Sequence, residues 1–227
     1  MPLSVGIVDS GAAPALRRKL LAETRLLLRS DGSIDRAAAG DDVLGHGAQI
    51  ARIILDLAPA ASLVCAQAFS HRRAADAGLV AQGIHWCLDQ GVRVINLSFG
   101  LHSDVEVLRH ACGRAAASGV LLVAAFPARG APVYPAAYPE AVAVSGDARC
   151  DGSSWSVIEP GRLIGACTAA ADGKSHGGAS YAAARISGVA ARFFGARPNA
   201  DNRECLAWLQ ANATFRGRER RTAPRAA

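Results

Sequence analysis

The sequence predicts an α/β fold with a mostly parallel central sheet and helices on both faces. Short apolar runs alternate with segments of helical periodicity, and glycine-containing turns separate them. The apolar runs are continuously hydrophobic rather than alternating, which is typical of parallel strands buried on both faces. Of the 227 residues, 51% are hydrophobic and 19% are charged, so we expect one globular domain with a sizeable core.

The expected elements follow one another with short connections. In the first third we expect a strand at 3–8, a helix at 15–29, a polar loop at 30–42, a helix that opens at His46, a strand at 61–69 and a surface turn at 71–73. The middle third predicts a helix at 79–90, a strand at 92–100, a helix at 105–118 and a strand at 120–125. Gly91 and Gly119 are expected to end the two helices of this second set.

Composition excludes several classes of protein. No apolar run approaches the roughly 20 residues that cross a bilayer, so no membrane segment is expected. Residues 1–4 (MPLS) lack the basic region of a signal peptide, which predicts a cytoplasmic protein. No CxxC pair occurs, and we interpret the six cysteines as reduced core thiols: Cys65, Cys87, Cys112, Cys150, Cys167 and Cys205. Neither a metal nor a cofactor is expected, because no paired-ligand spacing links His71, His85, His102, His110 and His176.

The net charge of +6 is concentrated near the C-terminus. We therefore divide the chain into one domain over residues 1–213 and a basic tail over residues 214–227. The tail lacks aromatic residues interleaved with its arginines, so a solvated terminus is favoured over a nucleic-acid-binding segment.

Three side chains suited to nucleophilic or acid–base chemistry lie within two residues of a glycine. Asp9 follows the first strand, where functional groups collect in α/β sheets, although an aspartate in an ordinary turn has the same context. His46, between Gly45 and Gly47, opens an apolar helix, which favours a general base over a core histidine. Ser180 starts an Ala-rich helix, either as its N-cap or as a nucleophile in the field of the helix dipole.

The sequence around these residues resembles the subtilisin-like serine proteases. The resemblance extends from about residue 3 to residue 195 and rests on motifs in matching order: VGIVDSG at 5–11, GHG at 45–47, GIHW at 83–86 with VINLSFG at 94–100, YPAAYP at 134–139 with AVAV at 141–144, and GAS at 178–180. The order Asp, His, Ser is also the one found in subtilisin. The family implies a minimal subtilisin-like fold.

The resemblance implies a catalytic triad. Ser180 attacks the scissile carbonyl, His46 transfers the proton, and Asp9 holds His46 in the required tautomer. It also implies a substrate-binding set and a cis peptide bond at Tyr134-Pro135 that shapes the specificity pocket. The substrate-binding residues are Ser98, Phe99, Gly100, Ala125, Phe126 and Arg129.

The chain departs from the family where the oxyanion is bound. Ala128 stands where the family has an asparagine that donates to the oxyanion, which leaves the Ser180 backbone N–H as one donor. Three interpretations of Arg129 stay open. Its side chain donates to the oxyanion, it selects acidic substrate side chains by its charge, or it is simply exposed to solvent. Phe126, Pro127 and Leu101 replace small residues, which predicts a narrower pocket and a selective enzyme.

The expected function is therefore endoproteolysis of a specific peptide or protein precursor. Within the family, the chain resembles small proteases that remove leader peptides, such as the one that matures a subunit of quinohemoprotein amine dehydrogenase. This implies a precursor substrate and a complex with other maturation proteins. The alternative is a weakly active or inactive pseudoprotease that binds a peptide as a chaperone or scaffold, which the loss of the asparagine suggests.

Overall fold

The computed structural model describes residues 3–69, 76–171 and 178–219. The predicted surface turn at 71–73 and the last part of the predicted tail, residues 220–227, lie outside these ranges. The strands are β1 (Ser4–Asp9), β2 (Leu20–Leu28), β3 (Ile34–Ala37), β4 (Ser62–Gln67), β5 (Val94–Leu97), β6 (Leu121–Ala125), β7 (Ala141–Gly146), β8 (Trp155–Glu159), β9 (Leu163–Ala166) and β10 (Phe215–Arg216).

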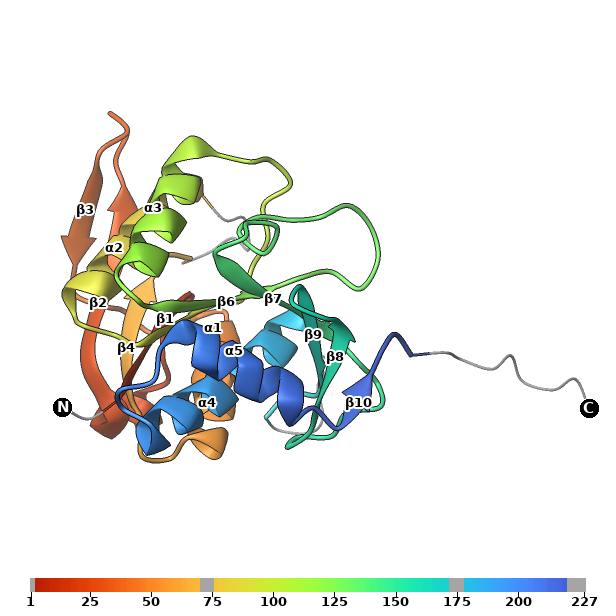
Figure 1. Ribbon diagram of the computed structural model, residues 1–227. Coiled ribbons are helices and arrows are strands. Elements are labelled where there is room, and N and C mark those ends of the chain that lie inside the picture. Colours follow the sequence, from red (N-terminus) through yellow and green to blue (C-terminus); the bar gives the residue numbers. More distant parts are fainter. Residues whose placement is uncertain (1–2, 70–75, 172–177, 220–227) are drawn as a thin grey trace, which may run out of the picture.

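Helices cover both faces of this sheet (Figure 1). The helices are α1 (His46–Leu57), α2 (Ala77–Asp89), α3 (Glu106–Ala117), α4 (Ala179–Ala196) and α5 (Asn202–Ala211), and a 3-10 helix covers Pro14–Lys19. Helices α2 and α3 lie on one face, and α1, α4 and α5 lie on the other. The predicted α/β fold with helices on both faces is confirmed. None of the described helices is long and apolar enough to cross a membrane.

The sheet has the order β10-β8-β9-β7-β6-β5-β1-β4-β2-β3. All pairings from β9 through β2 are parallel, and β3 and β8 pair antiparallel with their neighbours β2 and β9. After β1 the chain forms β2, β3 and β4 on one side of β1, and β5 then pairs with the other side of β1. Open α/β sheets bind ligands where the strand order reverses in this way.

The central strands and α4 form the middle of the core. Every residue of β1, β5 and β6 is buried, as the continuous apolar runs predict. Small residues dominate the buried face of α4, so α1 packs closely alongside it. These packed elements place the start of α1 and the start of α4 at the same edge of the sheet.

The predicted helix at 15–29 is wrong over most of its length. After the short 3-10 helix, residues 20–28 form β2, which pairs in parallel with β4. Thr24 and Leu26 are buried on one face of β2, with the period of two that a strand requires. The helix propensity of Leu, Arg and Glu is a weak preference, and the open edge of β4 overrides it. The predicted loop at 30–42 also contains β3, which pairs with β2.

The last third of the chain contains elements that the sequence patterns did not predict. Strands β8 and β9 and helix α5 extend and cover one end of the sheet. The start of the predicted basic tail belongs to this region, because β10 pairs with β8 and Arg218 forms an ion pair with Glu159.

Candidate active site

The candidate site is a cavity of about 220 Å³ at the carboxyl ends of β1, β4 and β5. The cavity therefore lies at the reversal of strand order that the topology defines. Its lining combines residues from these strand ends and from the starts of α1 and α4: Asp9, Ser10, Leu44, His46, Phe69, Ser98, Phe99, Gly100 and Ser180. Asp9, His46 and Ser180, far apart in sequence, thus line one space.

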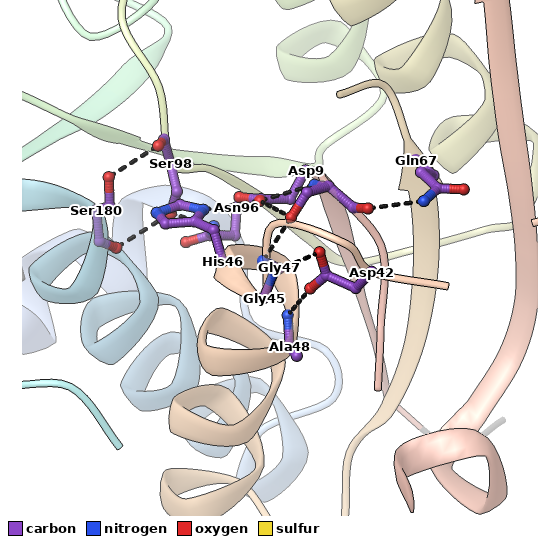
Figure 2. A network of polar contacts seen from close by, with 11 residues as sticks. Asp9, Asp42, Gly45, His46, Gly47, Ala48, Gln67, Asn96, Ser98 and Ser180 are labelled. Atoms are coloured by element: carbon purple, nitrogen blue, oxygen red, sulfur yellow. Dashed lines mark hydrogen bonds and ion pairs between the residues drawn. The ribbon is translucent and has the colours of Figure 1, made fainter. Parts of the chain in front are cut away.

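Asp9 and His46 form the central polar contact. Oδ1 of Asp9 lies 2.7 Å from Nδ1 of His46 and also accepts a hydrogen bond from the Ser10 backbone N–H at 2.8 Å (Figure 2). The Asp9 side chain is 1% exposed and the His46 side chain 29% exposed. A carboxylate at Nδ1 favours the tautomer with its proton on that nitrogen, so Nε2 of the neutral ring carries the basic lone pair.

Two glycines explain why His46 stands at the first position of α1. Gly45 has a φ of 68°, a left-handed conformation in which the chain turns into the helix. At Gly47, an added Cβ would lie 2.2 Å from the backbone oxygen of Gly11, so only glycine permits this approach of α1 to the loop after β1. The two glycines on either side of His46 therefore position its imidazole ring beside Asp9.

Asp42 satisfies the backbone at the start of α1, a role that the sequence patterns did not predict. Its two carboxylate oxygens accept hydrogen bonds from Gly45 N at 2.9 Å and Ala48 N at 2.7 Å (Figure 2). Ser10 Oγ accepts a third, from Gly47 N at 2.9 Å. These contacts supply partners for N–H groups that a helix start leaves without acceptors.

Gln67, at the end of β4, is a second positioning residue that was missed. Its amide nitrogen donates to the carbonyl of Ser10 at 2.8 Å and to that of Asp41 at 3.2 Å, and its amide oxygen accepts from Gly40 N at 3.0 Å. Gln67 is buried, and a polar residue in an apolar strand signals such partners. Gln67 therefore joins the loop that follows Asp9 to the loop that precedes His46.

Ser180 is not the cap of its helix. The N-cap of α4 is Gly178, which makes no side-chain cap bond, and Ser180 is the second helical residue. Its backbone N–H is among the first four, which have no acceptor within a helix. Among the described residues, the Ser180 hydroxyl donates to the carbonyl of Ser98 at 2.8 Å rather than to His46 (Figure 2).

Tyr181, the next residue, stacks on the imidazole ring. The ring centroids of His46 and Tyr181 lie 5.8 Å apart and the planes are inclined by 23°. The ring of His46 is thus held at one edge by Asp9 and across one face by Tyr181.

Two buried cysteines, Cys65 on β4 and Cys87 on α2, are unsuited to act as nucleophiles. Burial, followed by the charge of Asp9, raises the pKa of the Cys65 thiol well above its ordinary value. Burial also raises the pKa of the Cys87 thiol. Because the thiolate is the reactive form, both remain inert core thiols.

The predicted substrate-binding residues divide between two cavities. Ser98, Phe99 and Gly100 line the small cavity with Asp9, His46 and Ser180. Phe126 and Arg129 line a separate cavity of about 670 Å³, together with Ala128. Ala125 is buried at the end of β6, and the structure does not place it in either cavity lining. Strands β5 and β6 are neighbours, so the segments that follow them leave the same edge of the sheet.

The wall beyond Gly100 is tightly packed. An added Cβ at Gly100 would lie 2.6 Å from a methyl carbon of Val133, and Leu101 pairs with Tyr134 in an antiparallel bridge. The Tyr134-Pro135 peptide bond is cis, as predicted. The segment after β5 is therefore fixed against the loop that precedes β7.

The chain is similar to known proteases over most of its length. The family model described as the Subtilase family (Peptidase S8) matches residues 2–224. The minor extracellular protease Epr of Bacillus subtilis is 31% identical over 63% of this chain and 23% of its own length. The M-protease of Shouchella clausii is 29% identical over 76% of this chain and 50% of its own length. The chain thus spans about half the length of these relatives or less.

Solved structures share the fold at low sequence identity. A psychrophilic protease superposes with a TM-score of 0.72 at 21% identity, covering 94% of this chain and 83% of its own. The protease domain of PatA gives a TM-score of 0.68 at 23% identity, covering 86% of this chain and 80% of its own. With the family model matched over nearly the whole sequence, the chain belongs to the subtilase family.

Proposed function

We propose that this protein is a serine endopeptidase that acts through an acyl-enzyme intermediate on Ser180. The observation that carries the proposal is the 2.7 Å contact between the buried carboxylate of Asp9 and Nδ1 of His46, in the cavity that Ser180 also lines. A nucleophile, a base and a group that orients the base are the parts that acyl transfer requires.

In the proposed reaction, Ser180 Oγ leaves the carbonyl of Ser98 and turns to Nε2 of His46. His46 takes the hydroxyl proton as Oγ bonds to the scissile carbonyl carbon, whose oxygen becomes an oxyanion. The imidazolium returns this proton to the amine when the C–N bond breaks. Water, with His46 again as base, then hydrolyses the ester, and Asp9 stabilises the cationic ring throughout.

The Ser180 backbone N–H is the oxyanion donor in this scheme. It lies in the first turn of α4, where the N–H groups and the helix dipole favour negative charge. The side chain of Ala128 has no group that donates a hydrogen bond. We therefore propose an enzyme with one fewer oxyanion contact than the family's usual arrangement.

Restoring a donor at position 128 tests this arrangement. The variant Ala128→Asn is expected to raise kcat by up to about 100-fold, because such a donor contributes about 100- to 1,000-fold, a range established on subtilisin itself. Ala128→Leu, of similar size without a donor, is the matched control and is expected to give no gain. Equal turnover by Ala128→Asn and wild type in steady-state assays would show that another group already donates there.

The segment after β5 fits an extended substrate. Ser98, Phe99 and Gly100 border the small cavity, where main-chain groups of a substrate can pair with theirs. Leu44 and Phe69 complete the apolar wall, and the rings of Phe69 and Phe99 meet edge to face with centroids 5.6 Å apart. We propose that an apolar substrate side chain occupies this space.

Arg129 is proposed to select an acidic side chain in the larger cavity. It is exposed and lines that cavity beside Ala128, so a carboxylate bound there gains a charge-assisted contact. The wild type is expected to cleave a glutamate-containing peptide with a kcat/KM about tenfold above that of its lysine counterpart. Arg129→Glu is expected to reverse this ratio, so that the lysine peptide is preferred by about tenfold. Competition assays with the paired peptides measure this ratio. An unchanged ratio of kcat/KM in Arg129→Glu would show that Arg129 does not contact the substrate.

We propose that the biological role is the removal of a leader peptide from a precursor in the cytoplasm. The apolar and charged walls of the two cavities support a selective enzyme, and the quinohemoprotein amine dehydrogenase subunit is the first precursor to assay. A maturation complex with other proteins would present such a precursor. Incubation of the precursor with wild type, followed by mass spectrometry of the products, tests the role and identifies the scissile bond.

The second candidate function is a pseudoprotease that binds a peptide without cleaving it. Two observations favour it: Ala128 lacks a donor side chain, and the Ser180 hydroxyl is bonded to Ser98. A fluorophosphonate probe separates the candidates, because it requires an activated serine. The proposed protease forms an adduct on Ser180 in the folded protein, whereas a scaffold binds peptide and forms none.

A further inference from the structure

A buried chain of side-chain hydrogen bonds runs from the middle of α4 back to its first turn. Ser187 Oγ donates to Asn96 Oδ1 at 2.9 Å, and Asn96 Nδ2 donates to Ser98 Oγ at 2.7 Å. Ser98 Oγ then donates to the backbone carbonyl of Ser180 at 3.0 Å (Figure 2 shows the links from Asn96 onward). Ser187 and Asn96 are 0% exposed and Ser98 is 5% exposed.

This chain of hydrogen bonds runs in one direction, from Ser187 to Ser180. A serine hydroxyl has one proton, and the amide of Asn96 has a donor end and an acceptor end. Because Ser187 donates to the oxygen of Asn96, the NH₂ group of Asn96 is turned toward Ser98. Ser98 accepts that bond and is left to donate its own proton to Ser180. The hydroxyl of Ser187 thus fixes the orientation on which the last bond depends.

The last bond holds the start of α4. Among residues 3–69, 76–171 and 178–219, no side chain caps this helix, and Gly178 at its N-cap position has no side chain to do so. Ser98 instead contacts Ser180 twice, because its hydroxyl donates to the Ser180 carbonyl and its carbonyl accepts from Ser180 Oγ at 2.8 Å. These two bonds fix the first turn of α4, including the Ser180 N–H, relative to the end of β5.

We propose that Ser187, acting through Asn96 and Ser98, is a positioning residue for the nucleophile Ser180. Ser187 lies seven residues, about two turns, along α4 from Ser180, and it therefore lies on the same face of the helix. It does not line the cavity, and it acts by keeping Ser180 aligned with the segment after β5. The inference rests on the proposed function of Ser180.

The test compares two buried serines that each donate to a side-chain oxygen. Ser187→Ala removes the first link of this hydrogen-bond chain. Ser156→Ala removes the bond to Asp147 from a 0% exposed serine on β8, which lies four strands away from β5. The rate of labelling by a fluorophosphonate probe, kcat, KM and the melting temperature are measured for each. Both variants are expected to lower the melting temperature.

Only Ser187→Ala is expected to slow the labelling of Ser180 and kcat, by about tenfold and with KM within twofold, since one net hydrogen bond is worth up to about that factor. Ser187→Thr keeps the hydroxyl and is expected to restore most of the rate. Equal labelling rates for Ser187→Ala and Ser156→Ala would overturn the proposal.

Ser98→Ala breaks the same chain at its last link and serves if Ser187→Ala does not fold. Ser98→Ala is expected to lower the labelling rate and kcat further than Ser187→Ala does. The double variant is expected to be no slower than Ser98→Ala, because both substitutions act through one contact. If the two rate losses multiply in the double variant, Ser187 does not act through Ser98. Absence of labelling in the wild type would instead refute the proposed function, so the two failures are distinguishable.

Discussion

The variant Ser180→Ala is expected to lose cleavage by about five to six orders of magnitude, the loss that follows removal of a triad nucleophile. The hydroxyl that lines the cavity with His46 is gone, and no acyl-enzyme intermediate can form at that position. Product formation under single-turnover conditions, followed by mass spectrometry, measures the loss. Residual cleavage would reflect the remaining oxyanion and binding contacts.

The substitution removes one of the two bonds between Ser180 and Ser98 and keeps the other, so the fold is expected to be retained. Ser98 Oγ donates to the backbone carbonyl of Ser180, and that carbonyl remains when alanine replaces serine. An unchanged melting temperature and retained binding of the peptide substrate are the controls. Equal cleavage by wild type and Ser180→Ala would end the assignment of Ser180 as nucleophile.

The variant Asp9→Asn is expected to lower kcat by about 10,000-fold with a small change in KM. Oδ1 of Asp9 accepts bonds from His46 and Ser10 and is almost fully buried. An amide in this place removes the charge that stabilises the imidazolium. It can also present an NH₂ group to His46, which would turn the basic lone pair toward position 9 and away from Ser180.

The matched control is the same substitution at Asp201. This residue caps α5 by accepting from Glu204 N at 2.8 Å, and asparagine is an equally good N-cap. Asp201→Asn therefore removes one negative charge without loss of helix stability, and its kcat is expected to equal that of wild type. A similar kcat for both variants would show that the Asp9 charge is not used in the reaction.

The sequence alone was sufficient for the β/α alternation and for the choice of Asp9, His46 and Ser180. Strands buried on both faces carry continuous apolar runs, and glycines stand where the backbone makes a left-handed turn or a close approach, as at Gly45 and Gly47. These signals are local, so they can be recognised without knowing the neighbours in space.

The segment at 20–28 shows where local signals fail. Its leucines, arginine and glutamate suit a helix, but the edge of β4 offers backbone partners that only a strand can use. The positioning residues Asp42 and Gln67 were missed for a related reason. Their partners are backbone groups of loops whose approach depends on how α1 packs, and no spacing in the sequence encodes that contact.

The sequence by itself determined the family resemblance, the alternation of core strands and helices and the choice of the three proposed catalytic groups. The tertiary structure decided which contacts those groups make. It showed that Ser180 is not a helix cap, that its hydroxyl contacts Ser98, and that Ser187 and Asn96 are linked to it through the core. Periodicity and motif spacing report on neighbours along the chain. A buried hydrogen bond between α4 and β5 exists only once packing has brought the two elements together.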